Sequence, residues 1–295
     1  MRKIHLATFI AISGMIANVS SGALISDDFE VDSSASYAVL DDGNAPSGDG
    51  TPDGAIAFAF DYITAGIPLA PNSTAGDIGG LRMAANETGD DAGAADHISA
   101  FHLTSVNSGA YTVSVDIYMA IENAGGTTEF SSVGVGSDGS DFNSIFTPIA
   151  GVGQFLSMTG DGGSSSDFRH YIQGTPVNSG DPSYLNSTST TQSSGDTYQA
   201  IYPGGDFPGS PGNRWTTMTI SVNPSRVLYS LDGTPVVSAA SVKTDGLVGL
   251  SYSDVFSSVG PHFVVFDNLV VEIPEPASVS LMVVAVAGLL SRRRS

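Results

Sequence analysis

Short runs in which every second residue is apolar recur along this chain, and they constrain its fold more than any other feature. In 111–119, five apolar side chains alternate with Thr, Ser, Asp and Tyr. A period of two places one set of side chains on each face of a β-strand. Similar or continuous apolar runs occupy 55–62, 215–222, 226–232, 247–252 and 262–272. Turn-forming residues separate the runs, and Asn223-Pro224-Ser225 should join 215–222 to 226–232 as a hairpin. We therefore predict an all-β body of about ten strands.

Charge and cysteine content exclude several classes of protein. The stretch 24–276 holds all 30 acidic residues but only 5 basic ones, a formal charge of −25. Such a surface repels phosphate backbones, so nucleic acid is not an expected partner, whereas divalent cations are attracted. The chain has no cysteine, which excludes disulfides, thiolate metal sites and cysteine nucleophiles.

The first 23 residues have the three parts of a secretory signal peptide. Arg2 and Lys3 are followed by an apolar run from Leu6 to Ile16, and Ser21-Gly22-Ala23 forms a small-x-small site with cleavage expected after Ala23. The alternative, a membrane anchor, requires a longer apolar run. We therefore expect a helical signal peptide over 1–23 and an exported protein.

The C-terminus has a second three-part pattern. Pro274-Glu275-Pro276 precedes an apolar run over 277–290, and Arg292, Arg293 and Arg294 follow. This order resembles the PEP-CTERM sorting signal of Gram-negative bacteria over 274–295. The resemblance implies a transmembrane helix, processing by a membrane exosortase, and a final place on the cell surface or in the extracellular matrix of an organism that makes exopolysaccharide. A plain C-terminal anchor is the alternative.

The body, residues 24–273, resembles a concanavalin A-like lectin/glucanase (LamG-like) domain. The residues that carry this resemblance are Asp27-Asp28-Phe29, the Trp-led run 214–222, the Tyr-Ser-Leu-Asp-Gly run ending at Gly233, and 266–271. The family fold implies a two-sheet antiparallel jelly-roll sandwich in which the terminal strands pair. Residues near Phe29 should then lie beside 263–271.

No motif marks the chain as an enzyme. The Glu-x-Asp-x-x-Glu strand of glucanases on this fold is absent, as is a Gly-x-Ser-x-Gly elbow. The His-Glu-x-x-His and His-x-His spacings typical of zinc sites are absent too, so a zinc site is not expected. Glu122 and Glu129 flank a Gly-rich turn and could face each other across a hairpin. They are the residues on which a glycan-active hydrolase, the least favoured interpretation, would depend.

Two kinds of binding site are predicted instead. Calcium is the expected ion because acidic loops supply oxygen ligands, and the metal-binding residues we select are Asp138, Asp141, Asp161 and Asp167. For a glycan, Trp215 on the Thr-rich face of its strand could form a platform with Asp116 and Tyr118. The structural alternative is that Trp215 caps a sheet edge or fills a second core layer.

Together these features favour an exported, non-catalytic, lectin-like protein that binds extracellular polysaccharide. A matrix or envelope protein without a discrete ligand is the alternative. The lectin-like interpretation predicts a saturable glycan site, and the alternative predicts none.

Overall fold

The computed structural model describes ten stretches of the chain. They are 22–41, 54–86, 96–107, 109–122, 129–141, 152–160, 168–178, 180–185, 195–254 and 262–274. Ala23–Ile273 forms one compact unit, while the predicted signal peptide before Gly22 and the predicted tail after Pro274 lie outside the described residues. Within the described stretches, no helix has the length and apolar character needed to cross a membrane.

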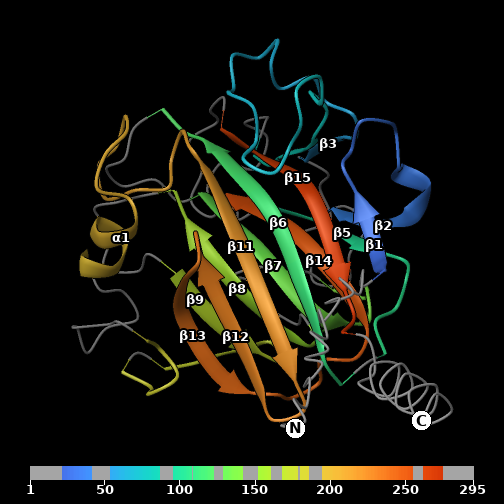
Figure 1. Cartoon of the computed structure of the whole chain (residues 1–295), viewed down its shortest axis with the longest axis vertical. Coiled ribbons are helices and arrows are strands. Elements are labelled where there is room, and N and C mark those ends of the chain that lie inside the picture. Colours follow the sequence, from blue (N-terminus) through green and yellow to red (C-terminus); the bar gives the residue numbers. More distant parts are fainter. Residues whose placement is uncertain are drawn as a thin grey trace, which may run out of the picture. The chain divides into compact units, whose positions relative to one another are not determined.

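Two antiparallel sheets form a sandwich (Figure 1), which confirms the predicted fold class. The front sheet has the order β13-β12-β11-β6-β15-β4-β3, with β1 also paired to β15. Its strands are β1 (Ala23–Asp27), β3 (Ala55–Ala57), β4 (Leu81–Ala84), β6 (Tyr111–Ala120), β11 (Trp215–Asn223), β12 (Arg226–Leu231), β13 (Thr234–Ala240) and β15 (Phe263–Glu272).

The back sheet has the order β10-β9-β8-β7-β14-β5-β2. Its strands are β2 (Tyr37–Asp41), β5 (Asp96–His102), β7 (Glu129–Ser137), β8 (Gln154–Thr159), β9 (Phe168–Ile172), β10 (Thr175–Pro176) and β14 (Leu247–Asp254). Two short helices, η1 (Ser34–Ser36) and α1 (Gly195–Ile201), complete the described elements.

The core lies between the sheets and follows the period of two. On β6, Val113, Val115 and Ile117 are buried in the main apolar cluster, whereas Thr112 and Ser114 on the other face are partly exposed. Burial of the alternate apolar side chains fixes the register, since a slip of one residue would turn them all outward. The same pattern on β11 and β12 gives the front sheet one apolar and one polar face.

Several predicted pairings are confirmed. Residues 215–222 and 226–232 form a hairpin (β11 with β12), in which Asn223 pairs with Arg226. The side chain of Asn223 accepts hydrogen bonds from the backbone N–H groups of Ser225 and Arg226, which stabilises the turn. The terminal strands also pair, because β1 runs antiparallel to β15 with Asp27 opposite Leu269.

Two predictions about local structure are wrong. The strand expected over 55–62 ends at Ala57, and Ala59 adopts a positive φ of 54° that breaks the extended chain. Glu122 and Glu129 do not face each other across a hairpin, because β6 lies in the front sheet and β7 in the back sheet. The period of two predicts strands but not which strands share a sheet.

Residues 60–80, here called the covering segment, lie over the outer face of the front sheet (Figure 1, cyan). Tyr62, Ile67 and Ala70 of this segment are buried against Tyr118 and Val265 of the sheet. Hydrogen bonds from Phe60 N to Gly80 O and from Gly80 N to Phe60 O join its two ends. The segment thus adds a small second apolar layer outside the main core.

Candidate functional site

The predicted glycan platform lies under the covering segment. Trp215 and Tyr118 are cross-strand partners on the outer face of the front sheet, with ring centroids 5.4 Å apart. The indole of Trp215 also packs against Tyr62 at 5.3 Å, and its Nε1 donates a hydrogen bond to Pro68 O at 2.6 Å. Trp215 is therefore part of the second apolar layer, as one form of the structural alternative predicts, and it does not cap a sheet edge, because β11 lies between β12 and β6.

Asp116, the third predicted ligand-binding residue, anchors the covering segment. It is fully buried, and it accepts hydrogen bonds from Asn72 N (3.1 Å) and Asn72 Nδ2 (2.8 Å). Thr217 Oγ1 (2.6 Å) and Asn268 Nδ2 (3.1 Å) donate to the same carboxylate. Four donors around one buried carboxylate hold the asparagine amides in fixed orientations.

Asp267 supports the same arrangement from the neighbouring strand. Its carboxylate accepts hydrogen bonds from Tyr62 OH at 3.1 Å and Ser73 Oγ at 2.8 Å, both in the covering segment. Burial raises the pKa of Asp267 to about 6, although the hydrogen bonds from Ser73 and Asn268 oppose the shift. The two aspartates thus fix one segment on two adjacent strands.

A polar pocket of about 270 Å³ opens beside this network. Its lining residues come from β6, from β15 and from the covering segment: Asn72, Thr112, Ser114, Asn268, Val270 and Glu272. The floor consists of two register pairs, Ser114 with Val270 and Thr112 with Glu272. A register shift in β15 between Asp267 and Val270 places Asn268 at a φ of 53° at the rim.

The pocket offers mainly hydrogen-bond acceptors. The amide nitrogen of Asn268 donates to Asp116 and to Ser73 Oγ, and that of Asn72 donates to Asp116 and Thr217. Among the described residues no group donates to the side-chain oxygen of either asparagine, so each oxygen can accept a hydrogen bond from a ligand. With the hydroxyls of Thr112 and Ser114 and the carboxylate of Glu272, the lining suits a neutral ligand that carries several O–H donors.

The predicted calcium loops are only partly described. Asp138 is exposed, and its Oδ1 accepts hydrogen bonds from Ser140 N (3.0 Å) and Ser140 Oγ (2.6 Å), which lower the pKa of Asp138. Asp141 is buried, and Asp161 and Asp167 lie outside the described residues. A calcium site in these loops stays a prediction.

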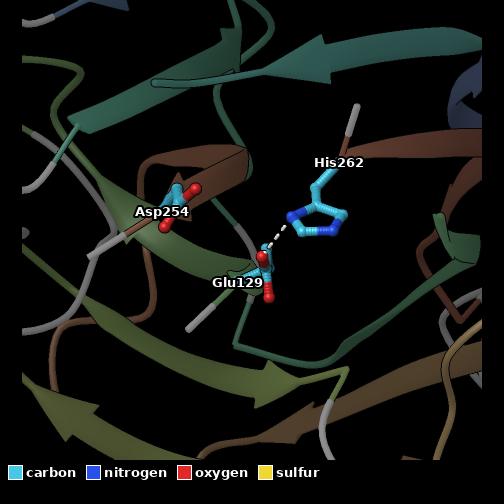
Figure 2. A group of neighbouring side chains, drawn as sticks. All are labelled: Glu129, Asp254 and His262. Atoms are coloured by element: carbon cyan, nitrogen blue, oxygen red, sulfur yellow. Dashed lines mark ion pairs between the residues drawn. The ribbon is translucent and has the colours of Figure 1, made fainter. Parts of the chain in front are cut away.

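The structure also brings together three residues that the sequence does not associate. Figure 2 shows Glu129 at the start of β7, Asp254 at the end of β14 and His262 just before β15. One potential ligand atom from each lies within 4.8 Å of the other two, and all three residues are buried. His262 Nδ1 lies 2.5 Å from Glu129 Oε1, and this carboxylate raises the pKa of His262.

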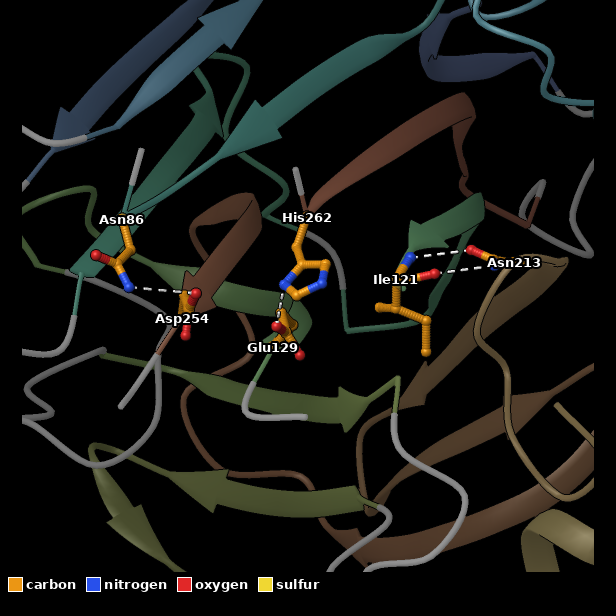
Figure 3. Close-up of polar contacts among 6 residues, drawn as sticks. All are labelled: Asn86, Ile121, Glu129, Asn213, Asp254 and His262. Carbon is orange, nitrogen blue, oxygen red and sulfur yellow. Dashed lines mark hydrogen bonds and ion pairs between the residues drawn. The ribbon is translucent and has the colours of Figure 1, made fainter. Parts of the chain in front are cut away.

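Amide side chains flank this acid–histidine cluster on both sides (Figure 3). Asn86 Nδ2 donates to Asp254 Oδ2 at 3.4 Å. On the other side, Asn213 accepts from Ile121 N and donates to Ile121 O, both at 2.9 Å, and so ends β6 with a backbone-like pairing. The cluster is therefore held in a well-connected end of the sandwich.

Sequence reasoning finds part of these sites. The alternation correctly places Asp116 and Tyr118 on one face of β6 and Trp215 on the Thr-rich face of β11, and the pairing of the two strands brings these faces together. It misses Asn72, because nothing local shows that residues 60–80 fold back over that face. It also misses the acid–histidine cluster, since Glu129 and His262 are far apart in sequence: Glu129 begins a strand of the back sheet, and His262 directly precedes a strand of the front sheet. In the described part of the chain, either site could have been found only by knowing which residues distant in sequence come into contact.

Comparisons with known proteins add little detail. No family model matches the sequence, and no curated protein matches it. Among solved structures, the metal-free Emp46p carbohydrate recognition domain matches with TM-score 0.49 and 9% identity, over 86% of this chain and 98% of that one. A Bacillus subtilis protein of unknown function with a galectin-like fold matches with TM-score 0.47 and 14% identity, over 86% and 97%.

The VIP36 exoplasmic/lumenal domain in its Ca²⁺/Man3GlcNAc-bound form matches with TM-score 0.46 and 9% identity, over 82% of this chain and 85% of that chain. Similarity at these levels assigns this chain neither a ligand nor a family.

Proposed function

We propose that this chain is a non-catalytic glycan-binding protein whose site is the polar pocket on the outer face of the front sheet. The observation that carries the proposal is the set of acceptors around that pocket. Two asparagine amides are fixed by Asp116, and they lie with two hydroxyls and one carboxylate around about 270 Å³. A sugar ring presents several O–H donors at close spacing, which such a lining can accept together.

The negative charge of the chain disfavours acidic glycans as ligands. A formal net charge of −20 and the carboxylate of Glu272 in the pocket disfavour uronic acids, sulfated sugars and phosphorylated sugars. The ligand class is therefore a neutral polysaccharide or its terminal sugar. The pocket lies below the usual range for drug-sized ligands, which fits recognition of one ring rather than a long segment.

The patterns at the two ends of the chain add a location to the proposal. The signal-peptide pattern up to Ala23 and the Pro274-Glu275-Pro276 tail with Arg292, Arg293 and Arg294 support export and exosortase processing of this protein. The protein would then bind polysaccharide on the cell surface or in the extracellular matrix. Calcium in the acidic loops remains part of the proposal.

Glycan-array binding followed by calorimetry on the purified full-length chain tests the proposal. We expect saturable binding to one class of neutral glycan, and loss of binding in chelator would place an ion at the site. Absence of binding to every neutral glycan, with and without calcium, would overturn the proposal in favour of a matrix protein without a discrete ligand.

Matched variants locate the site. Ser114→Ala and Glu272→Gln remove one acceptor each from the pocket and should each weaken binding about fivefold, because one hydrogen bond contributes about 1 kcal/mol. Ser230→Ala on β12 is the control, because Ser230 is a partly exposed serine of the same sheet outside the pocket. Equal affinity in all three variants would show that the glycan binds elsewhere.

A further inference from the structure

A row of three buried carboxylates crosses one end of the back sheet. Asp254 of β14 is the register partner of Asp96 on β5 and of Glu129 on β7. Their exposed fractions are 2%, 1% and 3%. Like charges directly opposite each other on neighbouring strands destabilise a sheet, and burial strengthens the repulsion. A row of this kind therefore favours a bound cation.

A buried atom of the cluster points to the same conclusion. Glu129 Oε2 has no hydrogen-bond partner among the described residues. The Glu129 residue is 3% exposed. Leaving a buried ionisable group unsatisfied is costly, and a metal ion that neutralises the group would remove most of that cost.

We propose that Glu129, Asp254 and His262 bind one divalent transition-metal ion of the zinc class. Imidazole nitrogen with carboxylate oxygen is a typical zinc ligand set, whereas calcium takes six to eight oxygen ligands. Three protein ligands leave a fourth position for water. The ion replaces the proton shared by Glu129 and His262. Those two ligand atoms must then separate from 2.5 Å to about 3.3 Å, which follows from metal–ligand bonds of ~2.0–2.1 Å.

The position of the ligands gives the ion a structural role. Glu129 and Asp254 belong to the back sheet, and His262 directly precedes β15 of the front sheet. One bound ion therefore joins both sheets at an end of the sandwich (Figure 2). Asn86, which donates to Asp254, orients that ligand (Figure 3). This metal site is independent of the glycan pocket, which lies on the outer face of the front sheet.

The test uses the full-length chain without a histidine tag, freed of metal by a chelator. Calorimetric titration with Zn²⁺ should give one high-affinity equivalent, and Ca²⁺ should not compete for it. At a free Zn²⁺ concentration about a hundredfold above Kd, the Tm should rise by about 5–10 °C. Co²⁺ in place of Zn²⁺ should give the visible d–d absorption of a low-coordinate site with a nitrogen ligand.

Variants assign the ligands. His262→Gln and Asp254→Asn should weaken Zn²⁺ binding more than tenfold, and Asn86→Ala about tenfold through the orientation of Asp254. His102→Gln on β5 is the matched control, since His102 lies outside the cluster, and it should leave the titration unchanged. If His262→Gln fails to fold, the Co²⁺ spectrum of the wild-type chain and the Asn86→Ala titration decide. No Zn²⁺ equivalent in the wild-type chain, or one that persists in His262→Gln, would overturn the proposal.

Discussion

Asp116 on β6 and Asp267 on β15 are register partners on neighbouring strands, and both carboxylates are buried under the same segment of chain. Five hydrogen bonds reach them from Tyr62, Asn72, Ser73 and Thr217. Asn268 donates to both, through its side chain to Asp116 and through its backbone N–H to Asp267. The covering segment is thus attached to the sheet by polar contacts as well as by its apolar side chains.

Stability should depend on pH through Asp267. The pKa of this residue is about 6 in the folded chain against an ordinary value of 3.8, mainly because of burial. The folded state therefore holds the proton more tightly than the unfolded state. The stability from this proton is fully present below about pH 4 and is lost as the pH rises through about 6.

Thermal unfolding of the wild-type chain and of Asp267→Asn between pH 3.5 and 8 checks this dependence. The Tm of the wild type relative to the variant should fall between pH 4 and 6 and then level off. Asp61→Asn is a control for which the pH dependence of stability has the opposite sign. Hydrogen bonds from Thr64 lower the pKa of the exposed Asp61, so its contribution to stability rises with pH. A difference between wild type and Asp267→Asn that does not change with pH would contradict the prediction.

Trp215→Ala should loosen the covering segment. The change removes the contacts with Tyr62 and Tyr118 and the hydrogen bond to Pro68 O. Because Trp215 is only partly buried, we expect a loss of about 2–3 kcal/mol, below the usual cost for a fully buried Trp. Hydrogen exchange should become faster at Tyr62 and Ile67, with little change in β14. Unchanged exchange would show that the apolar contacts do not hold the segment.

Asp116→Asn should be more harmful than Thr217→Val. An amide in place of the Asp116 carboxylate turns one acceptor into a donor that faces other donors, and we expect a loss of about 2–3 kcal/mol. Thr217→Val removes a single hydrogen bond from the same carboxylate and should cost about 1 kcal/mol. Chemical denaturation measures both values. Glycan affinity should fall in Asp116→Asn, because Asn72 and Asn268 lose their fixed orientations.

The sequence predicts features that depend on neighbouring residues, but not those that depend on contacts between distant residues. The alternation at 111–119 and 215–222 correctly predicts strands and the face on which Asp116 and Trp215 lie, because both depend only on neighbouring residues. The covering segment depends on contacts between Tyr62 and Asp267, 205 positions apart. Glu129, Asp254 and His262 meet only because three strand ends coincide, and no local pattern encodes that meeting.

The last prediction concerns two glycines that share a positive φ but differ in surroundings. Gly136 on β7 has a φ of 74°, and a Cβ there would collide with the backbone carbonyl of Lys243. Gly66 in the covering segment has a φ of 85°, and nothing lies within 4 Å of a Cβ at that position. Ala at either position is strained by about 1 kcal/mol, because a residue with a Cβ disfavours a positive φ. Only Gly136→Ala adds a steric clash.

We therefore expect Gly66→Ala to lower the free energy of unfolding by about 1 kcal/mol and Gly136→Ala by more than about 3 kcal/mol. Urea denaturation of both variants at one pH gives the two values directly. Similar losses would mean that the backbone near Lys243 moves aside at little cost. A large loss only in Gly136→Ala would show that β7 packs rigidly against the 243–246 connection, next to the strand that carries Asp254.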